Sequence, residues 1–143
     1  MSELPPGFQP HFRSSPATNP WEPLYSRRRE DGALELLFDV RTAHCNGRGF
    51  LHGGVLAALC DNARGLTVGN TLGHPAPQIV TISLGVDYVG SAEIGARVTI
   101  APRCLRAASG VSFCDALVTA GDRVIARANA SFRVRLPEST ERA

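Results

Sequence analysis

The sequence predicts an α+β domain in which one long helix packs against a single antiparallel sheet. The first observation is one run of apolar residues at helical spacing, which begins at Gly53 and extends to about Gly69. The second is that most of the remaining chain consists of segments rich in Val, Ile, Thr and Phe, which favour strands. The third is that the last three of these segments are joined by breaks short enough for hairpin turns, which makes that half of the chain an antiparallel meander.

The helix is indicated by both spacing and propensity. Ala57 and Ala58 are strong helix formers. The segment 69–77 is rich in Gly and Pro and is expected to end the helix. The apolar residues at helical spacing are Val55, Leu56, Leu59, Ala63 and Leu66.

Five strands are expected, one before the helix and four after it. The first alternates so that Leu34, Leu36 and Phe38 share one face. The two hairpin breaks lie at residues 108–110 and 121–122 and contain Gly. The expected strands are residues 33–40, 78–89, 97–105, 111–119 and 123–135.

The N-terminal segment is expected to be an irregular arm, because residues 1–23 hold six of the ten prolines. Phe8, Phe12 and Trp21 make it too apolar for a freely solvated tail, so it should lie on the domain or on a partner subunit. The polar residues 27–32 indicate a turn. The expected division is an arm at 1–26, a domain at 27–137 and a C-terminal tail at 138–143.

Length and composition narrow the class of protein. A chain of 143 residues fits one domain, and 43% hydrophobic with 20% charged residues is typical of a soluble globular protein. A net charge of +2 is too small to indicate nucleic-acid binding. No apolar run is long enough to cross a bilayer, and the N-terminus lacks the pattern of a secretory signal. We therefore expect a cytoplasmic protein that binds neither nucleic acid nor membrane.

The four cysteines predict neither a metal site nor a disulfide framework, since none forms a C-x-x-C pair or a zinc-like cluster with His. We expect them to be reduced and mostly buried. Cys45 lies beside the glycine-rich loop described next, so a thiol nucleophile is considered. It is disfavoured, because no motif places a His to activate it.

A loop that ends in two glycines at the start of the helix is the strongest candidate for chemistry. Backbone N–H groups at a helix start lack internal partners, and the helix dipole adds partial positive charge there. The two glycines, Gly53 and Gly54, permit close approach of a ligand. Such a place suits an oxygen that gains negative charge during acyl transfer.

Asp61 lies about two turns into the helix and is the candidate base. Helical spacing groups it with Ala57, Arg64 and Val68, away from the apolar stripe. A carboxylate between small or apolar residues is a candidate functional group. The alternative from periodicity is a solvated Asp61 that pairs with Arg64.

The spacing of this loop and helix resembles the signature of PaaI-type hotdog-fold acyl-CoA thioesterases, related to those of phenylacetate metabolism. The runs 80–89 and 126–134 also resemble the strands of that family, and the likeness covers roughly residues 30–136. It implies a curved antiparallel sheet wrapped around the helix, and hydrolysis of an acyl-CoA thioester to free acid and CoA. The residues that carry the signature are Asn46, Gly49, His52, Gly53, Gly54 and Asp61.

The resemblance also implies the roles of individual residues. The Gly53 amide, with Gly54 beside it, would polarise the thioester carbonyl. Asp61, from the opposite subunit of a dimer, would activate water or act as nucleophile. Asn46 would hold the water or the carbonyl, His52 would orient the loop, and Thr81 would assist the water. No cofactor or metal is implied, and two dimers would join into a homotetramer.

Several of these assignments have structural alternatives. His52 could be a loop residue without a proton-transfer role, Thr81 only a strand residue, and Asn46 a residue that fixes the turn. Arg64 could pair with Asp61, contact CoA phosphate or reach a neighbouring subunit. Phosphate contacts could also come from the late strands, where the candidates are Arg103, Arg106, Arg133 and Arg135.

Three other functions compete with hydrolysis. A non-catalytic acyl-CoA sensor is the main alternative, although the Pro-rich N-terminus does not look like the DNA-binding domain of hotdog regulators. The acid/base motif of hotdog hydratases and dehydratases is not found in this sequence. A purely structural or interaction protein would leave the complete signature unexplained. Which acyl group is attached remains open at this point.

Overall fold

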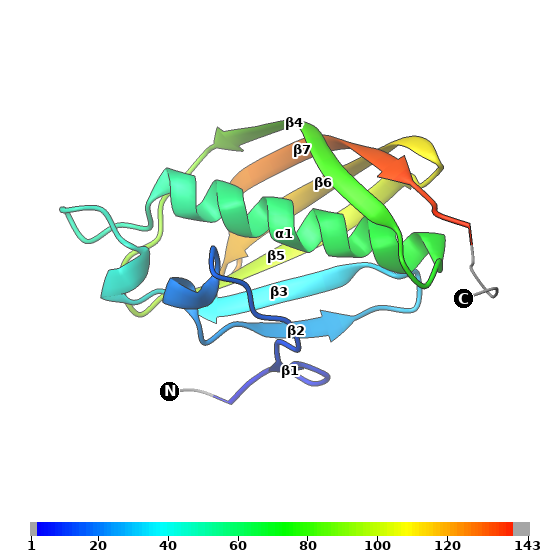
Figure 1. Ribbon diagram of the computed structural model, residues 1–143. Coiled ribbons are helices and arrows are strands. Elements are labelled where there is room, and N and C mark those ends of the chain that lie inside the picture. The colour runs from blue at the N-terminus through cyan, green and yellow to red at the C-terminus, as the bar shows by residue number, and fades with distance from the viewer. Residues whose placement is uncertain (1–2, 139–143) are drawn as a thin grey trace.

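The computed structural model describes residues 3–138, in which seven strands form one antiparallel sheet that curves around a single long helix (Figure 1). The predicted α+β architecture is therefore confirmed. The strand order across the sheet is β1-β2-β3-β5-β6-β7-β4. The elements are β1 (Gln9–Pro10), β2 (Tyr25–Arg28), β3 (Leu34–Asp39), α1 (Gly53–Leu72), β4 (Gln78–Tyr88), β5 (Arg97–Arg106), β6 (Gly110–Ala120) and β7 (Arg123–Arg135), with short 3-10 helices at Asn19–Trp21 and Thr42–His44.

Helix α1 continues past Gly69, where the glycine-rich segment was expected to end it. It stops at Gly73, whose φ of 69° is left-handed and whose N–H bonds to the Gly69 carbonyl. That conformation ends a helix and suits glycine, whereas a glycine with ordinary helical angles does not break one. In the described part of the chain, no helix has the length and apolarity needed to span a bilayer.

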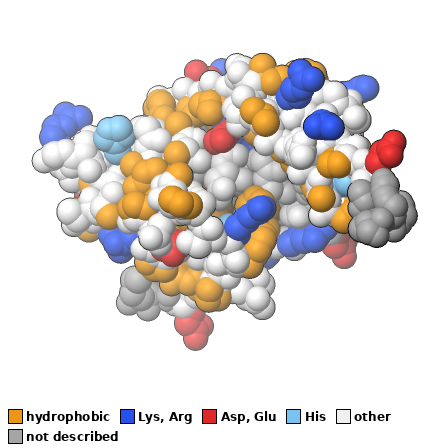
Figure 2. All heavy atoms as spheres, in the orientation of Figure 1, with side chains coloured by type: hydrophobic (Ala, Val, Ile, Leu, Met, Phe, Trp, Pro, Cys, Tyr) orange, Lys and Arg blue, Asp and Glu red, His pale blue; other side chains and the backbone are white. Residues whose placement is uncertain are grey.

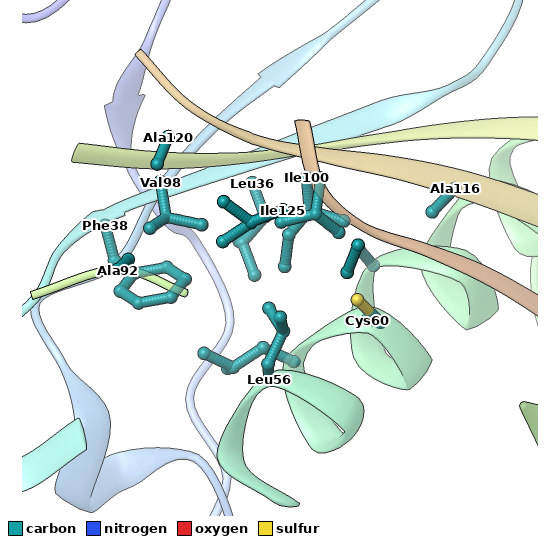
Figure 3. Close-up of a cluster of buried hydrophobic side chains, with 14 of the residues drawn as sticks. Leu36, Phe38, Leu56, Cys60, Ala92, Val98, Ile100, Ala116, Ala120 and Ile125 are labelled. Carbon is teal, nitrogen blue, oxygen red and sulfur yellow. The ribbon is translucent and has the colours of Figure 1, made fainter. Parts of the chain in front are cut away.

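The buried face of α1 differs from the expected stripe. Val55 and Leu66 are only partly buried, whereas Arg64 and Val68 are fully buried. Because the sheet is curved, it covers a wider face of the helix than one narrow stripe. The buried face therefore includes Cys60 and Arg64. Figure 3 shows side chains from α1, such as Leu56 and Cys60, pointing toward Leu36 and Ile100 of the sheet.

The predicted meander is confirmed, because β5, β6 and β7 pair in sequence as antiparallel neighbours. Strand β4 pairs with β7 on its other side, so the strand that follows the helix ends at an edge of the sheet. This arrangement places β4 beside α1 and leaves its outer edge without a neighbouring strand in the described residues.

The N-terminal region corrects two expectations. Residues 27–28 belong to β2 rather than to a polar turn, because the Arg27 guanidinium pairs with Glu35 on neighbouring β3 at 2.5 Å. The strand count rises from five to seven, since β1 and β2 extend the sheet. The boundary expected after residue 26 therefore falls inside β2.

The arm lies on its own domain, which is one of the two positions expected for it. Phe8 and Leu24 are buried, and the His11 N–H bonds to the Leu24 carbonyl at 2.8 Å. Arg27 fixes the start of the arm by donating to the Pro6 carbonyl and lying 4.4 Å from the Phe8 ring centre. Of the tail expected at 138–143, residues 139–143 lie outside the described residues.

Candidate active site

The loop before α1 is held by the side chains of Asn46 and His52. Asn46 Oδ1 accepts hydrogen bonds from the N–H groups of Arg48 at 2.9 Å and Phe50 at 3.2 Å. His52 is the N-cap of the helix, and its Nδ1 accepts from the Gly54 N–H at 2.9 Å. Both contacts match the structural alternatives considered for these residues. Because the Gly54 N–H already donates to His52, it is not free to donate to a ligand.

The Gly53 amide remains available at the start of the helix. No acceptor for its N–H occurs among the described residues, whereas its carbonyl accepts from the Tyr88 hydroxyl at 2.5 Å. A Cβ on Gly53 would lie 3.2 Å from the Tyr88 ring, so a side chain there would force a shift. Burial raises the pKa of Tyr88, which keeps the phenol protonated as a donor at neutral pH. Tyr88 was not singled out in the sequence.

Asp61 on α1 and Thr81 on β4 are joined by a hydrogen bond between their side chains. The Thr81 hydroxyl donates to Asp61 Oδ1 at 2.8 Å, and both residues are partly buried. This bond fixes one carboxylate oxygen and leaves the other, Oδ2, free to accept a proton from a reactant. The two residues line a groove of about 500 Å³ between α1 and β4.

A β-bulge in β4 explains how one strand reaches both ends of the site. Thr81 pairs with Phe132 and Ser83 with Ser131, so Ile82 is an extra residue and the register shifts by one. Without the bulge, strict alternation would turn Thr81 and Tyr88 to opposite faces of the sheet. With it, both face the helix, where Thr81 contacts Asp61 and Tyr88 contacts Gly53.

Asp61 and Gly53 are too far apart in one chain to act on the same carbonyl group. They are separated by eight positions along α1, which corresponds to about 12 Å of helix rise. A carbonyl that accepts from the Gly53 amide therefore lies beyond the reach of Asp61 in the same subunit. A site that uses both groups requires two copies of the chain.

Arg64 lies away from this groove. Its side chain is 0% exposed on the sheet side of α1, and its Nε donates to the Cys60 carbonyl at 3.1 Å. Its two terminal nitrogens have no hydrogen-bond partner among the described residues, and no ion pair there joins it to Asp61. In this conformation Arg64 reaches neither Asp61 nor a phosphate at the surface.

The cysteines show no sign of nucleophilic activation. All four are free, and burial raises the pKa of both Cys60 and Cys114 to about 12. Beside Cys45, both ring nitrogens of His44 are occupied, Nδ1 by the Arg41 N–H and Nε2 by the Trp21 carbonyl. His44 is therefore not free to act as a base on Cys45. No cluster of three or more potential metal-binding side chains occurs in residues 3–138.

The curved antiparallel sheet around one long helix, with a glycine loop at the helix start, defines a hotdog fold. The family model of the thioesterase superfamily matches residues 48–127, which include the loop, the helix and most of the sheet. The chain belongs to the thioesterase superfamily.

Similar proteins cover nearly the whole chain. A Pseudomonas aeruginosa protein whose name assigns it provisionally as an esterase is 31% identical over 94% of this chain and 99% of its own length. A hypothetical thioesterase of Streptococcus pneumoniae, solved with coenzyme A, aligns with a TM-score of 0.74, 23% identity and coverage of 83% and 94%. A Streptococcus mutans protein bound to acetyl-CoA aligns with a TM-score of 0.71, 25% identity and coverage of 80% and 90%.

Proposed function

We propose that this protein hydrolyses an acyl-CoA thioester to a free acid and CoA in a site built by two subunits. Asp61 of one subunit acts as general base on water, and the Gly53 amide of the other subunit donates a hydrogen bond to the carbonyl oxygen. The observation that carries the proposal is the hydrogen bonding of these two groups. Asp61 is oriented by Thr81 in an open groove, and the Gly53 amide has no acceptor within the described chain.

The proposed reaction needs no group beyond water and these residues. Asp61 Oδ2 takes a proton from water as the water oxygen bonds to the thioester carbon. The carbonyl oxygen becomes negative and is stabilised by the Gly53 N–H and the helix dipole. The C–S bond then breaks, the thiolate of CoA leaves, and the proton on Asp61 is available to it.

The second subunit is supported by the exposed edge of β4. This strand has eleven residues, and Val80 and Ile82 on it are 64% and 56% exposed. Long apolar edge strands are otherwise a site of aggregation, whereas pairing with a second copy would cover this one. In Figure 2, hydrophobic side chains gather along the margin of the molecule over β4. A further pairing of dimers into a homotetramer stays a prediction.

Coenzyme A as the leaving group is supported by the relatives. The Streptococcus pneumoniae protein was solved with coenzyme A and the Streptococcus mutans protein with acetyl-CoA. Membership of the PaaI-type branch and a cytoplasmic location stay predictions from the sequence. Arg103, Arg106, Arg133 and Arg135 of the late strands remain the candidates for phosphate contacts.

The direct test is thiol release from short, long and aromatic acyl-CoA esters by native protein and by Asp61→Asn. We expect the native protein to hydrolyse at least one ester, and the variant to lose about 10²- to 10⁴-fold in kcat, as general-base removal does. The variant should keep its oligomeric state in sedimentation, since Asn fills the same volume. Binding of acyl-CoA without turnover by the native protein would contradict hydrolysis and favour a sensor.

A further inference from the structure

The groove that starts at Asp61 extends well beyond the reacting groups. It follows α1 from Asp61 to Asn70 on one side, and β4 with the loop 74–77 on the other. Eight positions of helix rise correspond to about 12 Å between Asp61 and Gly69. Figure 2 shows a hollow in this part of the face, between the helix and β4. The groove is therefore long enough for an acyl chain in addition to the thioester.

Two helical glycines line this groove. Gly65 and Gly69 follow Asp61 at intervals of four residues and line the same wall. A Cβ on Gly69 would lie 3.5 Å from Ile79 and 3.8 Å from Pro77, and one on Gly65 would lie 3.9 Å from Phe132. A methyl group at either position would already be in ordinary van der Waals contact with the facing wall, so a larger side chain would have to extend outward into the groove. Each glycine lowers the stability of the helix by about 0.5–1 kcal/mol relative to alanine. Stability alone would therefore not favour glycine at these two positions.

The N-terminal arm forms the far end of the groove. Phe12 and Arg13 line it, although they precede the start of the helix by some forty positions in the printed sequence. Phe12 is 70% exposed and also borders a second hollow that contains Asn70, which places it near the end of the groove opposite Asp61. The preceding His11 is fixed by its N–H bond to Leu24 and by a 2.9 Å contact between Nδ1 and the Ser26 hydroxyl.

Charged side chains of both signs line the groove. Asp61 is the one acidic residue that lines it, and Arg13 is the one arginine. Arg13 forms no hydrogen bond or ion pair with any described residue. The side chain of His74, which lines the groove beyond the end of α1, already contacts the Pro137 carbonyl and the Ala76 N–H. Arg13 is thus a cation in the lining of the groove with no ion-pair partner among the described residues, and its neighbour Phe12 borders the end near Asn70.

We propose that the groove binds the acyl group, and that Arg13 recognises an anionic end of that group. The substrate class is then the CoA thioester of a medium-length dicarboxylic acid. The apolar chain would lie along Gly65 and Gly69, and its terminal carboxylate would meet the Arg13 guanidinium beside Phe12. A guanidinium matches a carboxylate with two parallel hydrogen bonds. This inference rests on the proposed hydrolysis, to which it adds the identity of the acid.

The test compares suberyl-CoA with octanoyl-CoA, which differ only in the terminal carboxylate. Native protein should prefer suberyl-CoA in kcat/KM. Arg13→Gln should lower kcat/KM for suberyl-CoA about tenfold, mainly through KM, because a hydrogen bond to a charged group contributes on that scale. The effect on octanoyl-CoA should be much smaller. Arg123→Gln is the matched control, since this exposed arginine lies at the start of β7, outside the groove and outside the second hollow.

Three outcomes would overturn the inference. One is hydrolysis of both esters by native protein with no preference for suberyl-CoA. Another is an equal loss on both esters in Arg13→Gln, together with weaker inhibition by free CoA, which would assign Arg13 to CoA phosphate. The third is an equal effect of Arg13→Gln and Arg123→Gln. Failure of the proposed function is distinct, because then native protein would hydrolyse neither ester.

Discussion

The two edges of the sheet are built in opposite ways. Strand β1 ends one edge with only two residues, Gln9 and Pro10, and the proline has no N–H to offer another strand. Strand β4 ends the other edge with eleven residues, several of them apolar and exposed. Proteins normally shorten, charge or cover an edge strand, because an open one pairs with other chains. The β1 edge follows these rules and is closed to further pairing, whereas the β4 edge is open to it.

The two edges also differ in their distance from the candidate catalytic residues. The closed edge belongs to the arm, which contacts its own domain. The open edge is strand β4, whose Thr81 donates a hydrogen bond to Asp61 and whose Tyr88 donates one to the first residue of the helix. The functional groups therefore lie beside the edge that is left open. The second subunit proposed above would complete both the open edge and the site beside it.

The largest effect is expected from charging the open edge. The double substitution Val80→Lys with Ile82→Lys places two ammonium groups along β4, where pairing would bring them against the second copy. We expect sedimentation to show monomers and hydrolysis to fall as far as in Asp61→Asn. Leu105→Lys is the control, because Leu105 is similarly exposed at 55% but lies on β5, inside the sheet. A charged-edge variant that is monomeric and fully active would refute the two-subunit site.

A smaller effect is expected from Thr81, which connects the open edge to Asp61. Thr81→Val removes the hydroxyl that donates to Asp61 Oδ1 and keeps the volume of the side chain. We expect kcat to fall about tenfold, since hydrogen bonds to charged groups contribute roughly 1.5–3 kcal/mol. Thr81→Ser, which keeps the hydroxyl, should retain most of the activity. Equal losses in both variants would assign Thr81 to packing instead.

The smallest effect is expected from His44, which lies in the 3-10 helix that follows β3. Its pKa is lowered from 6.5 mainly by burial, and the Arg41 N–H that faces Nδ1 leaves no room for a proton there. The unfolded chain therefore binds protons first as the pH falls below 6.5, so stability decreases from there toward the lowered pKa of the folded state. We expect the Tm to fall modestly between neutral pH and about pH 5.5.

The ring of His44 can be followed separately by NMR. The pKa of His11 is also lowered mainly by burial, so the pH dependence of Tm is best measured in His11→Gln, where the contribution of His44 remains. Titration of the His44 ring at or above its ordinary pKa, or a Tm that rises on acidification, would contradict this account. The oligomeric state should not change over this range, since β4 carries no histidine.

The sequence predicted the elements well where local pattern decides them. The meander of β5 to β7 was predicted because short Gly-containing turns separate its β-rich segments. The strand β2 was missed because Arg27 and Arg28 look like a solvated turn until Glu35 is brought beside them by the fold. The end of α1 was misplaced because composition cannot show which glycine adopts a left-handed φ.

The candidate site was predictable only in part, and for similar reasons. Spacing and resemblance gave Asp61 and Gly53, and the structure brings Thr81 to Asp61. The contact of Tyr88 with Gly53 depends on the bulge at Ile82, which alternation along the strand does not reveal. Phe12 and Arg13 join the groove across some fifty positions of sequence, and no local pattern links an arm to a helix at that distance.

The most direct test of the two-subunit site is to combine two inactive variants in one dimer. Gly53→Pro removes the amide donor at the first helical position, where proline fits. Gly53→Ala is its control, because it meets Tyr88 in the same way but keeps the N–H. Dimers that carry one Asp61→Asn chain and one Gly53→Pro chain would be purified by two different tags. We expect about half of the native activity per dimer, since one of the two sites is intact. Mixed dimers as inactive as either parent would contradict a site shared between subunits.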